Sequence, residues 1–274
     1  MKKLYPIFVN HNSGDQLYDG IHAVLKSQSV AGIVIVDNDS KDGSLLRIER
    51  MKNPKITILK SKKNLGFYRA LNIGIKKALV LGADLVMPLD FDLDFSFDFI
   101  SRIARIEADI VAPILKSKMY GKWFYDYGGK FNWVTGESSH ILRSKHKKGI
   151  GIIAASQNES DPNQFDFVSG GCTIFKKEVF SKLGFFDEDY FVYFGDADFS
   201  VLAMKKGFKV VLDGSTVVHH KIEVASQTRN FRKLRISLFD NLTFIHKRIK
   251  WYYQPLAYGN IFIIIIRVLL KTFS

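Results

Sequence analysis

The sequence predicts an α/β protein with a mostly parallel central sheet and helices on both faces. Short apolar runs rich in β-branched residues alternate with helical apolar spacing through the first hundred residues, and polar residues follow each run. The composition, 47% hydrophobic and 24% charged over 274 residues, is that of a globular chain with one large domain, or one domain and an appendage. The runs expected to form the first strands are Leu4–Val9, Ile33–Val36, Ile56–Leu59 and Leu85–Leu89.

Helices are predicted between these strands, because apolar residues recur there at intervals of three or four. A turn-rich piece at 38–44 opens the second helix, which runs through Arg50. Strands that alternate with helices of this length favour parallel pairing. The residues that mark the first and third helices are Leu17, Ile21, Val24 and Leu25, and Leu71, Ile75, Ala78 and Leu79.

The regular alternation stops in the second half of the chain. Residues 120–149 are rich in glycine, aromatic and basic residues, which favours a hairpin or mobile loop over the edge of the sheet. An acidic segment occupies 187–198. The further elements predicted are a strand at Phe165–Val168, a helix at Lys177–Leu183, and strands at Phe208–Leu212 and Thr216–His219.

Polar residues follow the first four predicted strands. Ligands of open parallel sheets bind outside the carboxyl ends of the strands, so these residues should converge on one edge. This topology predicts a ligand site without the help of any motif. The residues are Asn10-His11-Asn12, Asp37-Asn38, Asn64 and Asp90-Phe91-Asp92.

Asp90 and Asp92 are candidate metal ligands. Two carboxylates two residues apart on a tight turn can hold Mg²⁺ or Mn²⁺, which favour oxygen ligands and often share them with substrate phosphates. Two solvated loop aspartates are the alternative interpretation. The sequence has no GxGxxG after the first strand and no GxxxxGK[ST], which argues against a dinucleotide oxidoreductase and a P-loop NTPase.

More acids and histidines lie in the second half of the chain. Asp196 and Asp198 open a predicted helix, where the amide dipoles favour a carboxylate and where a helix N-cap is the alternative role. His219 and His220 end a predicted strand, so their side chains should point to opposite faces and one can reach the acids. Cys172, the only cysteine, is interpreted as a small packed residue rather than a nucleophile.

Five blocks in this order resemble the family 2 glycosyltransferases, which are inverting nucleotide-sugar enzymes with the Rossmann-like GT-A fold. The resemblance covers about residues 4–221 and is strongest to rhamnosyltransferase-like and related enzymes of bacterial cell-surface polysaccharides. It implies transfer of a sugar from a UDP- or dTDP-linked donor to a hydroxyl of a glycan or lipid-linked glycan. The blocks are FVNHNS at 8–13, VDNDSKDGS at 36–44, NLGFYRALNIGIKKAL at 64–79, PLDFD at 88–92, and the run from SGG at 169 to HHK at 221.

The resemblance implies a role for each matched position. Asp196 matches the catalytic base, and Gly170 and Gly171 match the stretch near the donor sugar and the acceptor. The positions matched to the divalent metal, Mn²⁺ or Mg²⁺, are Asp90, Asp92 and His220. The positions matched to donor binding are Asn10, His11, Asp37, Asn38, Asn64, Gly66 and Asp90.

One position departs from this pattern. Gly195 stands where the branch usually has a glutamate before the base, which removes an acid near the acceptor. Asp198 is therefore kept as the fallback candidate for the base or for orienting the acceptor.

The last fifth of the chain carries most of the excess positive charge. The net charge is +13, and 10 Lys/Arg against 2 Asp/Glu at 221–274 supply +8 of it. Apolar residues at 231, 234, 238, 242, 245 and 249 form one helical stripe, with basic residues opposite, as in helices that lie in a membrane interface. A helix packed on the catalytic domain is the alternative, and Ile261–Leu270 is a candidate homodimer interface. The basic residues opposite the stripe are Arg232, Lys233, Lys247 and Lys250.

These patterns predict a catalytic domain at 1–222 and a C-terminal basic amphipathic segment at 223–274. The nucleotide-binding half is expected at about 1–95 and the acceptor half at about 96–222. No signal peptide is recognised, and the stretch 251–270 is interrupted by polar residues, so we expect a cytoplasmic enzyme bound peripherally to the inner face of an anionic membrane.

Three alternative functions fit parts of the sequence less well. A sugar nucleotidyltransferase needs a glycine-rich loop with Arg or Lys after the first strand, which NHNSGD does not supply. A nucleic-acid-binding protein would suit the charge, but no zinc-finger, basic-zipper or RNP pattern is present. A nucleotide-binding module without transferase activity stays open because of Gly195.

Overall fold

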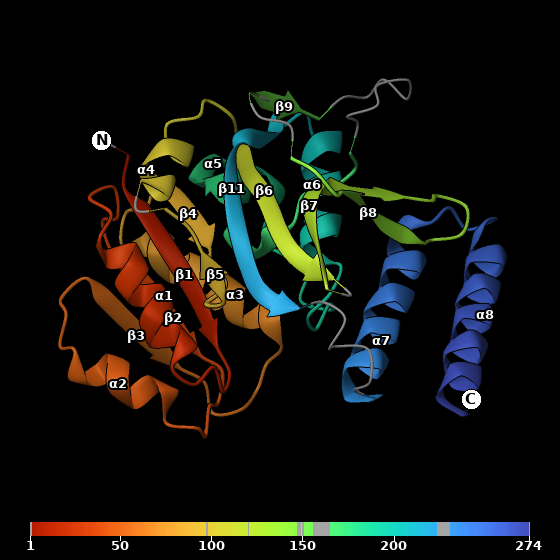
Figure 1. Ribbon diagram of the computed structural model, residues 1–274, viewed down its shortest axis with the longest axis horizontal. Coiled ribbons are helices and arrows are strands. Elements are labelled where there is room, and N and C mark those ends of the chain that lie inside the picture. Colours follow the sequence, from red (N-terminus) through yellow and green to blue (C-terminus); the bar gives the residue numbers. More distant parts are fainter. Residues whose placement is uncertain are drawn as a thin grey trace.

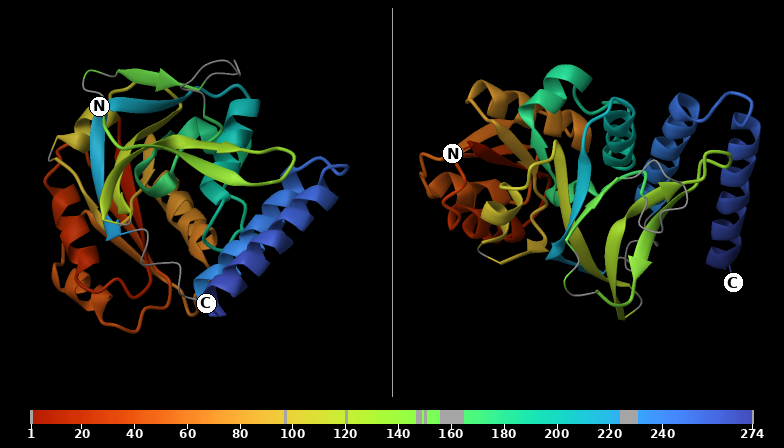
Figure 2. Two further views of the ribbon diagram at one scale, coloured as in Figure 1. Left: turned by 45° about the vertical axis from the view of Figure 1, so that its right-hand side comes forward. Right: turned by 90° about the horizontal axis from the view of Figure 1, so that it is seen from above.

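The structure is a computed structural model that describes residues 2–96, 98–119, 121–146, 149, 151–155, 165–223 and 231–273. It confirms the predicted α/β class, with one central sheet and helices on both faces (Figures 1 and 2). The main path of the sheet follows the order β3-β2-β1-β4-β10-β6-β11-β5. The strands are β1 (Leu4–Asn10), β2 (Ile33–Asp37), β3 (Ile56–Lys60), β4 (Leu85–Pro88), β5 (Leu93–Asp94), β6 (Ile110–Met119), β7 (Lys122–Phe131), β8 (Ser138–Arg143), β9 (Ile152–Ala154), β10 (Ile174–Lys176) and β11 (Val210–Glu223).

The N-terminal half of the sheet is parallel, as its sequence pattern predicts. β1 lies between β2 and β4, and β2 continues to β3. Asn10 pairs with Asp37 where β1 and β2 end, and β4 ends at Pro88, shortly before Asp90. The carboxyl ends of these strands therefore meet at one edge, which carries most of the polar residues of the predicted ligand site.

Two apolar cores lie on the two faces of this sheet. Alternate residues of one strand enter different cores, so that Phe8 and Ile35 belong to one and Ile7 and Val34 to the other. The first core is covered by α1 (Gln16–Leu25), α2 (Ser44–Arg50) and α4 (Phe99–Ile103). The second is covered by α3 (Phe67–Val80), α5 (Lys177–Leu183) and α6 (Gly195–Lys205).

The second half of the sheet is mixed, and one predicted strand is wrong there. β10 runs antiparallel between β4 and β6, and β6 runs parallel to β11. Phe165–Val168 forms no strand, and only Phe167 makes an isolated bridge, to Gly129. Its apolar side chains are buried because the segment fills the core beside β7 rather than extending the sheet.

The two strands predicted at Phe208–Leu212 and Thr216–His219 form parts of one long strand, β11. Its register against β6 shifts between Asp213 and Val217, which marks a bulge. The polar residues of this bulge look like a turn in the sequence, which explains the split prediction. The hairpin predicted within 120–149 is confirmed as β7 and β8, which pair antiparallel.

The C-terminal helices α7 (Phe231–Arg248) and α8 (Gln254–Phe273) run antiparallel at one edge of the molecule (Figures 1 and 2). Ile245 and Ile249, which belong to the stripe predicted to face a membrane, are buried in the second core instead. Ala257 and Ile261 of α8 join them. The alternative of a packed helix therefore describes the end of α7, whereas Phe231 at its start is 67% exposed. No helix in the described ranges is both long and apolar enough to cross a bilayer.

Two basic residues of α7 are also used within the protein. Lys247 Nζ lies 2.5 Å from Asp187 and 2.6 Å from Asp189, and Arg248 pairs with the buried Asp198. Lys247 is thus not part of a solvated basic face, which corrects the sequence prediction. These contacts bind α7 to the acidic segment that precedes and opens α6.

Asp240 forms a further polar link between α7 and the loop that precedes α6. Its buried carboxylate accepts the backbone amides of Phe191, Val192 and Tyr193 at 2.8, 2.9 and 2.7 Å. The loop that leads into α6 is therefore held in place by an acid from the C-terminal segment.

Replacing Asp240 by Asn is expected to lower the free energy of unfolding by about 2–4 kcal/mol, because an amide cannot accept all three backbone N–H groups. Urea denaturation measures this loss. Thr243→Ala is the control, since its hydroxyl bonds to the Phe239 carbonyl within α7, and it should cost less than about 1 kcal/mol. Equal losses in the two variants would show that the loop does not depend on Asp240.

Candidate active site

Two adjacent glycines separate acids that are far apart in the sequence. Gly170 and Gly171 begin the short helical turn η1 (Gly170–Cys172). A Cβ atom on Gly171 would lie 2.2 Å from Asp90 Oδ2, and one on Gly170 would lie 2.8 Å from the Asp196 Cβ. The Asp90 amide also donates to the Gly171 carbonyl at 2.8 Å. Asp90 and Asp196 therefore flank the glycine pair.

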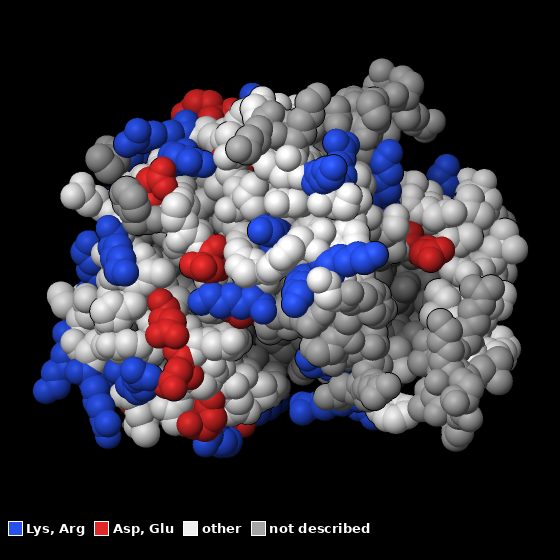
Figure 3. All heavy atoms as spheres, in the orientation of Figure 1, with Lys and Arg blue, Asp and Glu red and all other residues white. Residues whose placement is uncertain are grey.

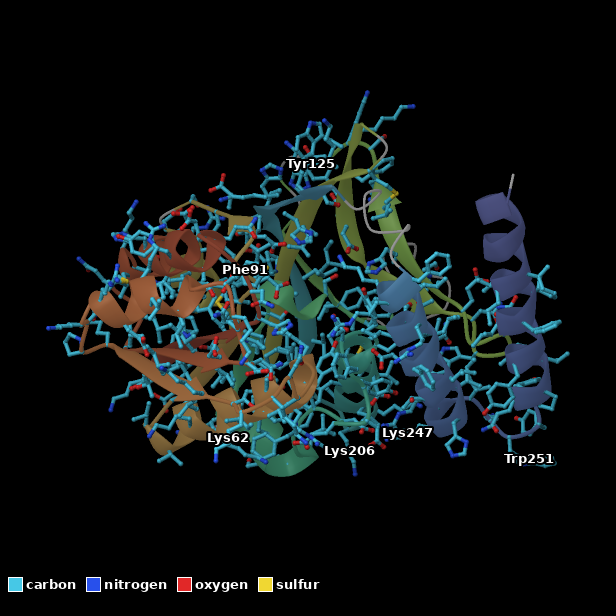
Figure 4. All side chains as sticks on the ribbon, turned by 90° about the horizontal axis from the view of Figure 1, so that it is seen from below. Lys62, Phe91, Tyr125, Lys206, Lys247 and Trp251 are labelled. Carbon is cyan, nitrogen blue, oxygen red and sulfur yellow. The ribbon has the colours of Figure 1, made fainter. Side chains whose placement is uncertain are left out.

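Asp92 and His220 complete the cluster on the Asp90 side. Asp92 is buried, and its Oδ2 lies 3.1 Å from His220 Nε2. Phe91, between the two acids of the turn, lies near the centre of the molecule in Figure 4. His219 instead packs its ring against Trp123, with ring centroids 4.8 Å apart, so the predicted divergence of the two histidines is confirmed.

The charges in this cluster perturb one another. Burial and the negative charges of Asp92 and Asp196 raise the pKa of Asp90 to about 7. Burial alone would lower the pKa of His220, but its hydrogen bond to Asp92 and the charges of Asp92 and Asp90 raise it above its usual value. Three acids gathered in one partly buried place are an arrangement that a bound cation stabilises.

The residues at this turn fit a divalent metal. Asp92 Oδ1 is buried and has no hydrogen-bond partner, so it is available as a ligand. In the part of the chain that the structure describes, no group of three or more His, Cys, Asp or Glu side chains is placed to hold a metal ion by itself, so water or a substrate would have to supply further ligands. Mg²⁺ commonly takes only one or two carboxylates from the protein and its other ligands from water and substrate phosphates, and the Asp90–Asp92 turn supplies that number.

Asp196 lies at the start of α6 with both oxygens directed by hydrogen bonds. Its Oδ2 accepts the Gly170 amide at 2.8 Å, and its Oδ1 accepts the Ala197 amide at 2.9 Å. The preceding Phe194 has a left-handed backbone with φ of 65°, which ends the loop and starts the helix. The loop conformation therefore presents this carboxylate to the glycine pair.

Tyr68 is a site residue that the sequence analysis missed. Its buried ring comes from the first turn of α3, and its hydroxyl donates to Asp196 Oδ1 at 3.2 Å. A Cβ atom on Gly195 would lie 2.5 Å from the Tyr68 ring. The signal that could have revealed Tyr68 is Gly195 itself, because an absent side chain there leaves room for another group.

Asp198, the fallback candidate for the base, is held elsewhere. Both of its oxygens pair with the Arg248 guanidinium, one of them at 2.9 Å, and its side chain is buried. Burial raises the pKa of Asp198, although Arg248 partly offsets this. Asp196 therefore stays the candidate for the base, and Asp198 does not. Cys172 is buried, and burial raises the pKa of its thiol well above the usual range, as suits a packed residue.

Asn10 and Asp37 are buried at the ends of β1 and β2. The Asn10 amide donates to Asp37 at 2.8 Å and to Ser44 at 2.9 Å, and its oxygen accepts from Ser13. Because both amide protons are used internally, the geometry does not support direct pairing of Asn10 with a base. These hydrogen bonds instead fix the loops that follow β1 and β2.

Asn38 links the second strand to the start of α3. It donates to Asn64 Oδ1 at 3.0 Å and to the Gly66 carbonyl at 3.1 Å, and it accepts the Leu65 amide. His11 is exposed and contacts the Asn38 carbonyl through Nδ1 at 3.0 Å. The predicted donor residues other than Asp90 therefore form one connected network, since the Asn38 amide also donates to the Asn10 carbonyl, and His11 presents its ring to solvent.

A second histidine approaches the site from β8. His140 Nδ1 lies 2.8 Å from Asp126, which also accepts the Ser169 hydroxyl at 3.1 Å. Burial would lower the pKa of His140, but Asp126 raises it, with a smaller contribution from Asp196. The sequence pattern gave no reason to single out this pair.

A parallel half-sheet with an acidic turn at its edge, facing a carboxylate, is the design of a GT-A glycosyltransferase, and the fold and site place the chain in that class. Residues 7–184, more than half of the chain, match the family described as Glycosyl transferase family 2. The chain belongs to this family and is a glycosyltransferase, which confirms the resemblance drawn from the five sequence blocks.

Two relatives of low sequence identity are both rhamnosyltransferases. The chain is 23% identical over 215 residues to the N-acetylglucosaminyl-diphospho-decaprenol L-rhamnosyltransferase of Mycobacterium tuberculosis, covering 72% of this chain and 69% of that one. It is 23% identical over 224 residues to the dTDP-rhamnosyl transferase RfbF of Shigella flexneri, covering 79% and 68%.

Solved structures show the same fold. GalNAc-T7 with UDP, GalNAc and Mn²⁺ superimposes with a TM-score of 0.64 at 16% identity, over 90% of this chain and 48% of that one. The mannosyltransferase PcManGT of Pyrobaculum calidifontis with GDP-Man and Mn²⁺ gives 0.57 at 14% identity, over 93% and 68%. The chain therefore spans about half the length of the GalNAc-T7 chain and two thirds of PcManGT.

Gly171→Ala is expected to abolish the rise in melting temperature that Mn²⁺ with UDP or dTDP produces, because the added methyl overlaps Asp90 Oδ2 and displaces it. Thermal unfolding with and without nucleotide and Mn²⁺ measures the effect. Gly151→Ala is the matched control, since a Cβ there meets nothing within 4 Å. Identical nucleotide-dependent shifts in both variants would remove Asp90 from the metal site.

Proposed function

We propose that this chain is an inverting transferase that moves a sugar from a UDP- or dTDP-linked donor to a hydroxyl of a glycan or lipid-linked glycan in bacterial surface polysaccharide synthesis. The observation that carries the proposal is the glycine pair with Asp90 on one side and Asp196 on the other. A buried acidic cluster suits a cation-bound diphosphate, and a carboxylate across the glycines suits a proton acceptor.

Asp196 acts as the general base in this scheme. Its Oδ2 takes the proton of the acceptor hydroxyl as that oxygen attacks the anomeric carbon. The bond from this carbon to the donor diphosphate breaks on the opposite side, so the configuration inverts in a single displacement. Gly170 holds the base through its amide, and the absence of side chains at both glycines lets Asp196 and Asp90 approach the turn closely.

A divalent ion, Mn²⁺ or Mg²⁺, would be held by Asp90, Asp92 and His220. When bound, it supplies Lewis-acid stabilisation of negative charge on the diphosphate. The GalNAc-T7 and PcManGT structures, which contain Mn²⁺ with UDP and GDP-Man, support this assignment.

The relatives favour a dTDP-linked rhamnose as the donor and a lipid-linked glycan as the acceptor. One relative is named as a dTDP-rhamnosyl transferase, and another as a rhamnosyltransferase of a diphospho-decaprenol acceptor. A panel of UDP- and dTDP-sugars with Mn²⁺, scored by melting temperature and by release of UDP or dTDP, tests the proposal. Absence of release with every sugar and with added lipid-linked glycan would reject it.

Asp196→Asn is expected to lower nucleotide release by about 10²–10⁴-fold while leaving the donor-induced rise in melting temperature unchanged, because an amide cannot accept the proton. Asp189→Asn is the control, since Asp189 is an exposed acid of the same segment that pairs with Lys247. Near-normal turnover of Asp196→Asn would exclude it as the base.

We further propose that the enzyme works at the cytoplasmic face of an anionic membrane, through α8 and the start of α7. Phe262 is 63% exposed and Ile263 is 48% exposed on α8. Because the two helices are antiparallel, the second half of α8 runs beside the first half of α7 (Figure 1). The first turns of α7 carry Arg232, Lys233 and Arg235. In the view of Figure 3 the described surface of α8 is largely uncharged. Exposed apolar residues beside basic ones suit an anionic lipid interface.

The double variant Phe262→Ser/Ile263→Ser is expected to lose most of its binding to vesicles containing phosphatidylglycerol, since both side chains would leave the lipid interface. Vesicle flotation measures this, with pure phosphatidylcholine as the uncharged comparison. Val80→Ser, at an 81% exposed position on α3, is the control. A change from dimer to monomer in the variant, with unchanged vesicle binding, would make this surface a contact with a second copy.

A further inference from the structure

The Asp196 carboxylate is held by hydrogen bonds that differ between its two oxygens. Oδ1 accepts from the Ala197 amide at 2.9 Å and from the Tyr68 hydroxyl at 3.2 Å. Oδ2 accepts only from the Gly170 amide, at 2.8 Å, among the described residues. A carboxylate oxygen accepts about two hydrogen bonds in its plane, so Oδ1 is saturated and Oδ2 keeps one acceptor site.

The Tyr68 hydroxyl has only one orientation that satisfies its surroundings. It accepts the Asp196 amide at 3.0 Å, so its own proton is directed to Asp196 Oδ1. The ring is buried between Phe186, with ring centroids 5.6 Å apart, and Gly195. Burial and the charge of Asp196 raise the pKa of the Tyr68 hydroxyl well above its usual value, so it stays protonated and remains a donor.

Gly195 is the steric condition for this contact. A side chain at 195 would begin 2.5 Å from the Tyr68 ring, so any residue larger than glycine would displace the ring from Asp196. The Tyr68 ring fills the space that a side chain at 195 would need. The glycine at 195 and the tyrosine on α3 therefore depend on each other.

We propose that Tyr68 is a positioning residue for the base. It saturates Oδ1 of Asp196 and turns Oδ2 toward the glycine pair, and Gly195 is glycine to admit its ring. Tyr68 also lies in the first turn of α3, directly after Gly66 and the Asn38–Asn64 network. The helix that borders the donor side thus sets the orientation of the base. This inference rests on the proposed role of Asp196.

Tyr68→Phe keeps the ring and removes only the hydroxyl. We expect kcat for the nucleotide sugar that the panel identifies to fall about 10- to 100-fold, with its KM unchanged, because donor binding does not involve the hydroxyl. Tyr190→Phe is the matched control, since Tyr190 is equally buried and its hydroxyl has no partner among the described residues. A loss of kcat equal to that of Tyr190→Phe would overturn the proposal.

The Asp196→Asn background separates this proposal from the proposed function. If Tyr68 acts through the base, Tyr68→Phe should lower turnover no further once Asp196 is replaced. If Tyr68→Phe lowered turnover by the same factor in the Asp196→Asn enzyme as in the wild-type enzyme, Tyr68 would act independently of Asp196. If Asp196→Asn itself retains activity, the proposed base is wrong, whatever Tyr68 does.

Crystal structures supply a readout that needs no turnover. In Tyr68→Phe the Asp196 side chain is expected to leave its single orientation on Gly170 and to occupy a second rotamer, whereas in Tyr190→Phe it should stay in place. An Asp196 side chain that keeps one orientation in Tyr68→Phe would overturn the proposal. Gly195→Ala should displace the Tyr68 ring and reproduce the kinetic loss of Tyr68→Phe.

Discussion

The close approach of two acids across Gly170 and Gly171 is the constraint on which this site depends. Any side chain at 171 would overlap the Asp90 carboxylate, and one at 170 would overlap Asp196. The Gly170 amide and the Gly171 carbonyl bind Asp196 and the Asp90 backbone from the same turn. A short glycine segment therefore fixes the separation between the proposed metal side and the proposed base side.

The C-terminal segment supports the loop and helix that carry Asp196, the proposed base. Asp240 holds the loop that precedes α6, Arg248 neutralises Asp198, and Lys247 binds the acidic segment. Ile245 of α7 is part of the core that α6 also covers. The end of α7 is therefore packed as part of the same fold, whereas Leu256, Phe262 and Ile263 of α8 stay exposed.

Much of the fold and part of the site could be predicted from local pattern. The alternation of strands and helices predicted the parallel half-sheet. The rule that ligands bind at the carboxyl ends of parallel strands singled out Asp37, Asp90 and Asp92. The mixed half was harder, because β10 has three residues and β11 contains a bulge, and neither has a clear period. The roles of Asn10 and Asp198 could not be predicted, because their partners are decided by long-range contacts.

The sequence by itself determined the class of fold, the family blocks and the residue types of the site. Local periodicity and motif spacing are properties of neighbouring residues, and they survive without knowledge of the three-dimensional contacts. Only the tertiary structure decided which oxygen of Asp196 is left open, that Tyr68 fills the space beside Gly195, and which helix surface remains exposed. Tyr68 and Asp196 are separated by 128 positions, as are Asp92 and His220. Contacts at such separations follow from how the whole sheet closes, and no local pattern encodes them.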